Sequence, residues 1–238
     1  MRQLKPRVAV SITELIVVLA VIGLLTAIIV PIVVASRRRA SGAACQAHVR
    51  QWSLALSLYT LDWDSSYPAA SQGAFSHSET TDETTWIKLV VPYVPRGLVP
   101  SCPSIRTPGR LQRYRGSTAA IGYAYNARLN YVVGSADRHR LSGRHEAVIQ
   151  FPALTVTLLD ARVGMIATRS PDVGITANEL HGLYAVDFTP ELLAQPEGGR
   201  RHEGSAMYSF ADGHVKQLLP TAFSTSSASI SRLPTFFP

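Results

Sequence analysis

One apolar stretch near the N-terminus limits what this chain can be. Residues 15–36 are 22 consecutive residues without a charged side chain. As a helix rising about 1.5 Å per residue, the stretch is roughly 33 Å long, enough to cross a bilayer core of about 30 Å. Glu14 lies at the start of this stretch, and Pro31 lies inside its far end. A carboxylate in that position is costly without a partner, so Glu14 is a candidate functional residue.

The simplest interpretation is a membrane anchor whose Glu14 reaches the lipid–water interface. The residues before the apolar stretch favour a second interpretation. Residues 1–9 form a short leader with three cations, which ends at Ala9 and is followed by Val10. This arrangement resembles the class III signal of type IV prepilins and type II secretion pseudopilins. The resemblance implies that a prepilin peptidase cleaves between Ala9 and Val10 and methylates the new N-terminus, and that Glu14 and Pro31 serve subunit assembly.

The orientation of the apolar stretch follows from the same resemblance. Cations flank the stretch on both sides, so the positive-inside rule does not decide which end of it lies in the cytoplasm. The resemblance implies a single-pass protein of the bacterial inner membrane, with the N-terminus in the cytoplasm and the bulk of the chain outside. A secretory signal peptide fits less well, because its apolar region is only about 7–15 residues long.

The net charge of +7 reflects the membrane end of the chain. Residues 51–238 contain 16 cations and 15 anions, so nucleic acid is not an expected partner. Arg110, Arg113 and Arg115 nevertheless belong to an arginine-rich block that is interleaved with tyrosines. A DNA-uptake pilin therefore remains an alternative.

The apolar stretch is expected to continue as a helix to about residue 61. Residues 10–36 are then the transmembrane part, and residues 37–61 are an amphipathic continuation. An apolar stripe with helical spacing runs along this continuation. Its members are Cys45, Val49, Trp52, Leu56 and Tyr59, and Leu54, Leu58 and Leu61 are expected to widen it.

Residues 62–219 are expected to form a small α+β head with an antiparallel sheet. The patterns predict a short helix at 85–93, a strand or irregular segment at 121–131, and strands at 147–151 and 154–160. Asp212-Gly213 predicts a two-residue type I′ hairpin between strands 206–211 and 214–219. Residues 220–238 are rich in Ser, Thr and Pro and are expected to be a poorly ordered tail.

His202 is followed by nine residues and then by Asp212-Gly213. This His-x9-Asp-Gly spacing, with Cys102-Pro-Ser and Gly122-Tyr-Ala-Tyr-Asn126, resembles a large group of bacterial prepilin-like proteins. The resemblance implies a long helix packed on a pilin-like head, and it leaves the role of the segment open. A hairpin turn and its entry are the simplest interpretation. A polar cluster, a metal site or a hydrolytic pair is the alternative, with Asp160 as a further member.

Two further site types are considered. Cys45 and Cys102 are the only cysteines and form either a disulfide or two buried thiols. Related pseudopilins bind calcium in a loop of the head, so the resemblance makes Asp62, Asp64 or Asp82 a calcium candidate. No EF-hand spacing is present, and no cofactor is assigned.

The chain has no Gly-x-Ser-x-Gly, His-Glu-x-x-His, phosphate-loop or Cys-x-x-Cys motif, and it is not expected to be an enzyme. The resemblance to prepilins instead implies a structural subunit that assembles into a type IV pilus or a type II secretion-like pseudopilus. Its partners would be the prepilin peptidase, other copies or related pseudopilins, and the inner membrane. A membrane-anchored extracytoplasmic enzyme or binding protein is the rival.

Overall fold

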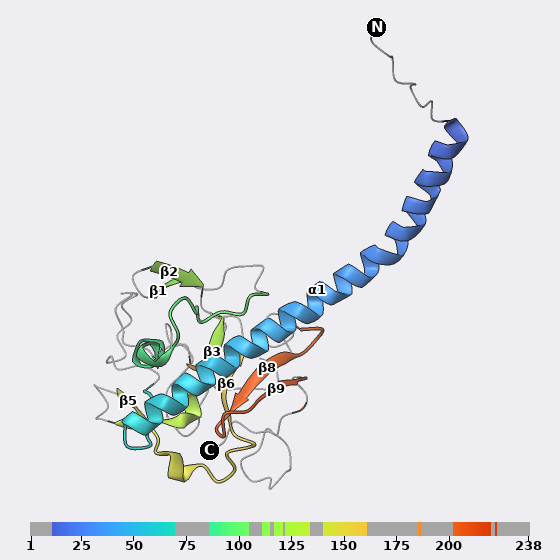
Figure 1. The fold of residues 1–238 in the computed structure, drawn as a ribbon. Coiled ribbons are helices and arrows are strands. Elements are labelled where there is room, and N and C mark those ends of the chain that lie inside the picture. The colour runs from blue at the N-terminus through green and yellow to red at the C-terminus, as the bar shows by residue number, and fades with distance from the viewer. Residues whose placement is uncertain are drawn as a thin grey trace. The chain divides into compact units, whose positions relative to one another are not determined.

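A computed structural model of the protein describes a long helix and much of the head (Figure 1). The described residues are 11–69, 86–104, 111–114, 117–120, 122–133, 140–160, 185–186, 202–219 and 222. The predicted leader, its cleavage site at Ala9 and Val10, and nearly all of the predicted tail lie outside this set.

Helix α1 runs without interruption from Ile12 to Asp62 and continues through Pro31. At its start, the Ser11 hydroxyl accepts a hydrogen bond from the Glu14 amide at 3.2 Å, as an N-cap residue does. At its end, Asp64 and Ser65 adopt left-handed backbone angles, with φ of 47° and 52°. The prediction of one helix ending near residue 61 is confirmed.

By its internal contacts the chain divides into two units, residues 1–41 and residues 42–238. In the first unit, every side chain from residue 11 to residue 40 is exposed. This part of α1 includes the apolar stretch, and α1 is long and apolar enough to cross a membrane. Inside the stretch, Thr26 satisfies its hydroxyl within the helix by donating to the Ile22 carbonyl at 2.7 Å.

The second half of α1 carries one buried apolar stripe. The five residues predicted for it are at most 5% exposed: Cys45, Val49, Trp52, Leu56 and Tyr59. The prediction that three leucines widen the stripe is wrong, because Leu54, Leu58 and Leu61 are 60%, 40% and 76% exposed. A helix turns about 100° per residue, so Leu54 lies about 200° from Trp52, on the opposite side.

The head contains a five-stranded sheet with the strand order β7-β3-β6-β8-β9. Its strands are β3 (Tyr123–Asn126), β6 (Val156–Asp160), β7 (Ala185–Val186), β8 (Ala206–Phe210) and β9 (Val215–Leu218). Neighbouring strands are antiparallel except β3 and β7, which are parallel. With the long N-terminal helix, this sheet makes the fold α+β, as predicted.

The second half of α1 packs across β3, β6 and β8 (Figure 1). The core between helix and sheet includes Trp52 from α1, Tyr125 from β3 and Met207 from β8. A smaller buried cluster, which includes Ala124 and Tyr208, takes the alternate positions of β3 and β8. Because successive side chains of a strand point to opposite faces, the two clusters lie on the two faces of the sheet.

A buried chain of hydroxyls also joins the helix to the sheet. Ser209 donates to the Ser53 hydroxyl of α1 at 2.9 Å, and the Thr157 and Ser209 hydroxyls lie 2.7 Å apart. The register between β6 and β8 shifts between Val156 and Leu158, so Thr157 is the extra residue of a bulge. The bulge allows Thr157 to reach the same hydroxyl chain as Ser209.

The remaining described elements are short. They are α2 (Trp86–Val90), η1 (Val91–Tyr93), β1 (Leu111–Tyr114), β2 (Ser117–Ala120), η2 (Ala127–Leu129), β4 (Asn130–Val133), β5 (Arg140–Gly143) and η3 (Glu146–Val148). β1 pairs with β2, and β4 pairs with β5, as two separate antiparallel ribbons. The predicted short helix at 85–93 is confirmed as α2 followed by η1.

Two local predictions are wrong. Residues 147–151 do not form a strand, because the first two of them belong to η3. The His145 side chain accepts a hydrogen bond from the Ala147 amide at 3.0 Å, which caps this turn. The hairpin of β8 and β9 forms, but its turn is not type I′. Only Gly213 has a positive φ, of 87°, and its amide bonds to the Phe210 carbonyl at 2.9 Å. This is the pattern of a type I turn followed by a left-handed glycine.

Candidate functional site

Four chemically reactive side chains meet inside the head. Cys45, Cys102, Asp160 and His202 are 0%, 1%, 0% and 6% exposed. They come from the buried stripe of α1, the loop after η1, the last position of β6, and the entry to the hairpin of β8 and β9. We refer to these four residues as the Cys–His–Asp cluster.

The donor atoms of the cluster converge on a small volume. All four atoms lie within 4.8 Å of one another. His202 Nε2 lies 3.1 Å from Asp160 Oδ2 and 3.4 Å from Cys102 Sγ. Cys45 Sγ lies 3.5 Å from the same Asp160 oxygen. Both cysteines are free thiols, so the structure contains no Cys45–Cys102 disulfide.

The backbone holds His202 and Cys102 in place. The amide and carbonyl of His202 both bond to Ser205, and Gln217 of β9 donates to the His202 carbonyl at 3.2 Å. Glu203 and Gly204 complete this tight loop with positive φ angles of 54° and 88°. On the cysteine side, the Ser104 amide donates to Cys102 Sγ at 3.4 Å. Such a bond stabilises a thiolate more than a thiol.

The four groups also shift one another's protonation. The hydrogen bond from Cys45, helped by the one from His202, lowers the pKa of the Cys102 thiol to about 5. The same bond to Cys102, together with burial, raises the pKa of the Cys45 thiol. Hydrogen bonds to Asp160 and then to Cys102 raise the pKa of His202 to about 9. These shifts favour the thiolate form of Cys102 and the imidazolium form of His202, next to the buried side chain of Asp160.

The structure separates Asp212 from His202, although the sequence allowed them to act together. Asp212 instead accepts a hydrogen bond from the His214 amide at 3.1 Å and also pairs with the His214 ring. That ring stacks on Phe210, with the ring centres 4.2 Å apart. Asp212 and Gly213 therefore shape the hairpin turn, while His202 belongs to the cluster together with Asp160.

From the sequence, His202 and Asp212 were the candidate residues and Asp160 a further member, but their sulfur partners were not identified. Cys45 and Cys102 were considered only as a disulfide or as two buried thiols, because no short spacing links them to His202. The one available indication was chemical, since Cys, His and Asp are all metal-ligand side chains.

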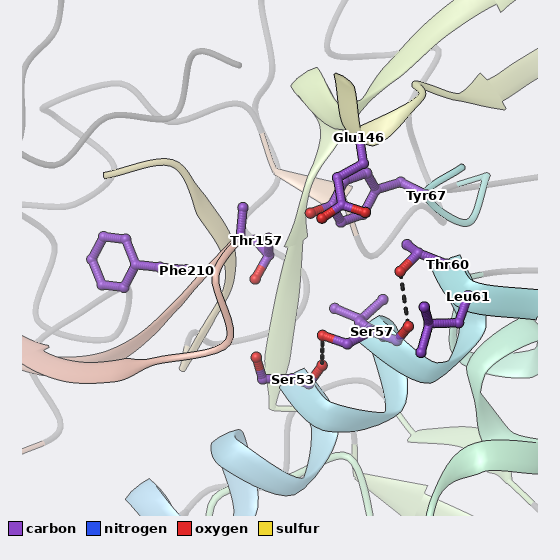
Figure 2. Close-up of a pocket in the computed structure, with 10 residues that line it drawn as sticks. Ser53, Ser57, Thr60, Leu61, Tyr67, Glu146, Thr157 and Phe210 are labelled. Atoms are coloured by element: carbon purple, nitrogen blue, oxygen red, sulfur yellow. Dashed lines mark hydrogen bonds between the residues drawn. The ribbon is translucent and has the colours of Figure 1, made fainter. Parts of the chain in front are cut away.

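A small pocket lies beside the end of α1 (Figure 2). It has a volume of about 140 Å³, and its polar lining includes Ser53, Ser57, Thr60, Glu146 and Thr157. Figure 2 shows Ser57 and Thr60 donating back to helix carbonyls, at 3.3 Å and 2.8 Å. These hydroxyls are therefore engaged within the helix rather than aimed together at a ligand.

The calcium candidates are not brought together as a ligand set. Asp62 and Asp64 line a hollow of about 520 Å³ at the end of α1, and Asp62 accepts a hydrogen bond from the Tyr93 hydroxyl at 2.8 Å. Asp82 lies outside the described residues.

The remaining predicted site residues lie elsewhere. Glu14 lies in the first turn of α1 and Pro31 lies within the exposed apolar part of the helix. Of the arginines proposed for DNA binding, Arg113 lies in β1, while Arg110 and Arg115 lie outside the described set.

Comparison of the chain with protein-family models, with curated proteins and with solved structures gives no match.

Proposed function

We propose that this chain is a prepilin-like structural subunit that is anchored in the inner membrane and assembles with other subunits through α1. The observation that carries the proposal is that the two halves of one continuous helix differ in which side chains they expose. Residues 15–36 expose apolar side chains all around α1, while the stripe that ends at Tyr59 is buried in the head. Such a helix can hold a head outside the membrane and still offer its apolar half to lipid or to identical helices.

The proposed maturation uses the N-terminal residues of the chain. Prepilin peptidase removes residues 1–9 and methylates the amino group of Val10. Glu14 then pairs with the Val10 amine of a neighbouring subunit. This pairing offsets the cost of taking both charges out of water. Pro31 removes one helical hydrogen bond and so eases local bending when the helices pack.

The mass of the native protein is the first test of this proposal. Protein isolated from its natural host should lack residues 1–9 and carry one added methyl group, as measured by intact-mass spectrometry. A native protein that begins at Met1 would contradict the proposed processing and would favour a simple membrane anchor.

The charge of Glu14 is the second test. Glu14→Gln keeps the size of the side chain and removes its charge, so we expect normal membrane insertion and at least tenfold less assembled material. Cross-linking and sedimentation of assemblies sheared from cells measure the effect. Ser11→Ala is the matched control, because it removes only the helix cap at the same end of α1. Normal assembly of Glu14→Gln, or an equal loss in Ser11→Ala, would refute the pairing role of the carboxylate.

A further inference from the structure

The Cys–His–Asp cluster has a composition that is typical of metal sites rather than of thiol chemistry. Two sulfurs, one imidazole nitrogen and one carboxylate oxygen face one another in a region closed to solvent. These donors are the ones that zinc uses in proteins. We propose that Cys45, Cys102, Asp160 and His202 bind one zinc ion with tetrahedral geometry, as a closed structural site. The proposal does not depend on whether the protein assembles as a pilin-like subunit.

The distances between donor atoms fit a zinc tetrahedron. Zinc forms bonds of about 2.0–2.3 Å to nitrogen, oxygen and sulfur, so its ligand atoms lie about 3.3–3.8 Å from one another. In the cluster, sulfur and oxygen are 3.5 Å apart, sulfur and nitrogen 3.4 Å, and nitrogen and oxygen 3.1 Å. All six distances between the four donor atoms are within 4.8 Å, so side-chain shifts of up to about 1 Å would bring the whole set into the range for zinc.

The orientation of His202 argues against a nucleophile–base–acid triad. In such a triad, one ring nitrogen faces the nucleophile and the other faces the carboxylate. Here Cys102 Sγ and Asp160 Oδ2 both approach the same atom, Nε2 of His202, at 3.4 Å and 3.1 Å. A proton on Nε2 cannot point at both atoms with good geometry. A metal ion placed between the three atoms satisfies all of them.

A disulfide would explain why the two cysteines lie together, but not why Asp160 and His202 lie beside them. It would draw the two sulfurs to about 2.05 Å and leave Asp160 and His202 as a buried pair beside it. Zinc instead employs both sulfurs, and the Ser104 amide bonded to Cys102 at 3.4 Å supports the thiolate that the metal requires. On binding, the thiol and imidazolium protons of the cluster leave to solvent. The two thiolates and one carboxylate carry three negative charges against the two positive charges of the zinc ion, so the complete site has a net charge of −1.

The site joins parts of the head that are far apart in sequence. Cys45 belongs to α1, Cys102 to the loop after η1, Asp160 to β6, and His202 to the loop before β8. A bound zinc ion therefore joins the helix, two loops and one strand of the sheet at one point. Since protein side chains fill all four positions and none is more than 6% exposed, the site leaves no position for a substrate. Its role is to stabilise the packing of α1 on the head.

The experiment uses the full chain, purified in detergent under reducing conditions. Elemental analysis should give about one zinc per chain. Exchange with cobalt(II) should give the near-ultraviolet absorption of thiolate-to-cobalt charge transfer and the strong visible bands of a four-coordinate site. The two cysteines should resist alkylation until a chelator is added. Because these readouts use the wild-type chain, they do not depend on whether a variant folds.

Two variants complete the experiment. His202→Gln should weaken cobalt binding at least tenfold and change the visible bands. His214→Gln is the matched control, because His214 is the histidine paired with Asp212 in the same hairpin, outside the cluster, and it should bind like wild type.

Two results would overturn the proposal. One is a Cys45–Cys102 disulfide in protein whose thiols were blocked at cell lysis. The other is a folded, reduced protein that takes up cobalt without thiolate absorption. Loss of metal in His214→Gln and not in His202→Gln would place the ion at the hairpin turn and would equally refute the site.

Discussion

Gly143 lies at a point where the backbone leaves no room for a side chain. A Cβ atom there would lie 1.5 Å from the carbonyl oxygen of Tyr67 and 2.5 Å from its carbonyl carbon. The Tyr67 segment cannot easily move away, because its amide bonds to the Arg144 carbonyl at 2.9 Å and the Glu146 amide bonds to the Ser65 carbonyl at 2.7 Å. Glycine is required here because two backbone segments approach closely, not because of its own torsion angles.

We therefore expect Gly143→Ala to lower the free energy of unfolding by about 2–3 kcal/mol, the upper part of the usual range for overpacking. Gly42→Ala is the control. Gly42 is helical, and the nearest atom to an added Cβ lies 3.8 Å away, an ordinary contact. That change should be neutral or stabilising by up to about 1 kcal/mol, because alanine favours helix. Denaturant unfolding followed by tryptophan fluorescence measures both. An unchanged midpoint for Gly143→Ala would show that the Tyr67 segment yields more easily than its hydrogen bonds indicate.

The residues of the Cys–His–Asp cluster differ in how well the sequence predicted their place in the site. The His-x9-Asp-Gly spacing named His202 together with Asp212, and Asp160 entered only as a further member of an alternative cluster, whereas the structure pairs His202 with Asp160. The contribution of Cys45 could not be predicted, because periodicity explains this residue fully as one member of an apolar stripe. Its second role depends on which strand end lies opposite α1. That information comes from long-range strand pairing, which local sequence patterns do not contain.

At the scale of elements, α1 tests how well helical periodicity predicts burial. The pattern identified the buried stripe, but adding Leu54 to it ignored the angle between positions on a helix. The structure places Leu56 at 2% exposure and Leu54 at 60%. Elsewhere, residues 147–151 are rich in strand-forming side chains, yet a local cap from His145 produces the short turn η3 instead. Propensity is weak there because one side-chain hydrogen bond is enough to change the outcome.

Leu56 and Leu54 form a matched pair on the same helix. Leu56→Ala should reduce the free energy of unfolding by about 2–5 kcal/mol, because it removes buried methyl groups and leaves a cavity between α1 and the sheet. Leu54→Ala removes the same atoms from an exposed position and should change stability by no more than about 0.5 kcal/mol. Both are measured by denaturant unfolding in detergent solution. Equal effects would mean that α1 does not pack on the head through this stripe.

For the whole molecule, hydropathy predicted the coarse architecture, and only the hairpin of β8 and β9 among the strand pairs followed from the sequence. One apolar helix and an α+β head could be read from the pattern along the chain. The sheet order β7-β3-β6-β8-β9 could not, because β3 and β8 lie on either side of β6 and are far apart in the sequence. The same limit applies to the Cys–His–Asp cluster, whose members meet only once that order is set.

The division into two units predicts that the second can fold without the first. A chain of residues 42–238 keeps the whole buried stripe of α1 and loses the part in which residues 11–40 are exposed. We expect this shortened chain to be monodisperse without detergent, whereas the full chain should require detergent because its exposed apolar helix would otherwise associate. Detergent phase partition and size-exclusion chromatography measure the difference.

The near-ultraviolet circular dichroism of the shortened chain provides the control for folding. Trp52 and Trp86 pack edge to face with ring centres 5.7 Å apart, so a folded head gives a tryptophan signal that an unfolded chain lacks. A shortened chain that shows this signal and stays in the aqueous phase would support an independently folded head carried by a separable anchor. If it aggregates or loses the signal, residues before Gly42 contribute to folding of the head, and the boundary between the two units does not mark an independent domain.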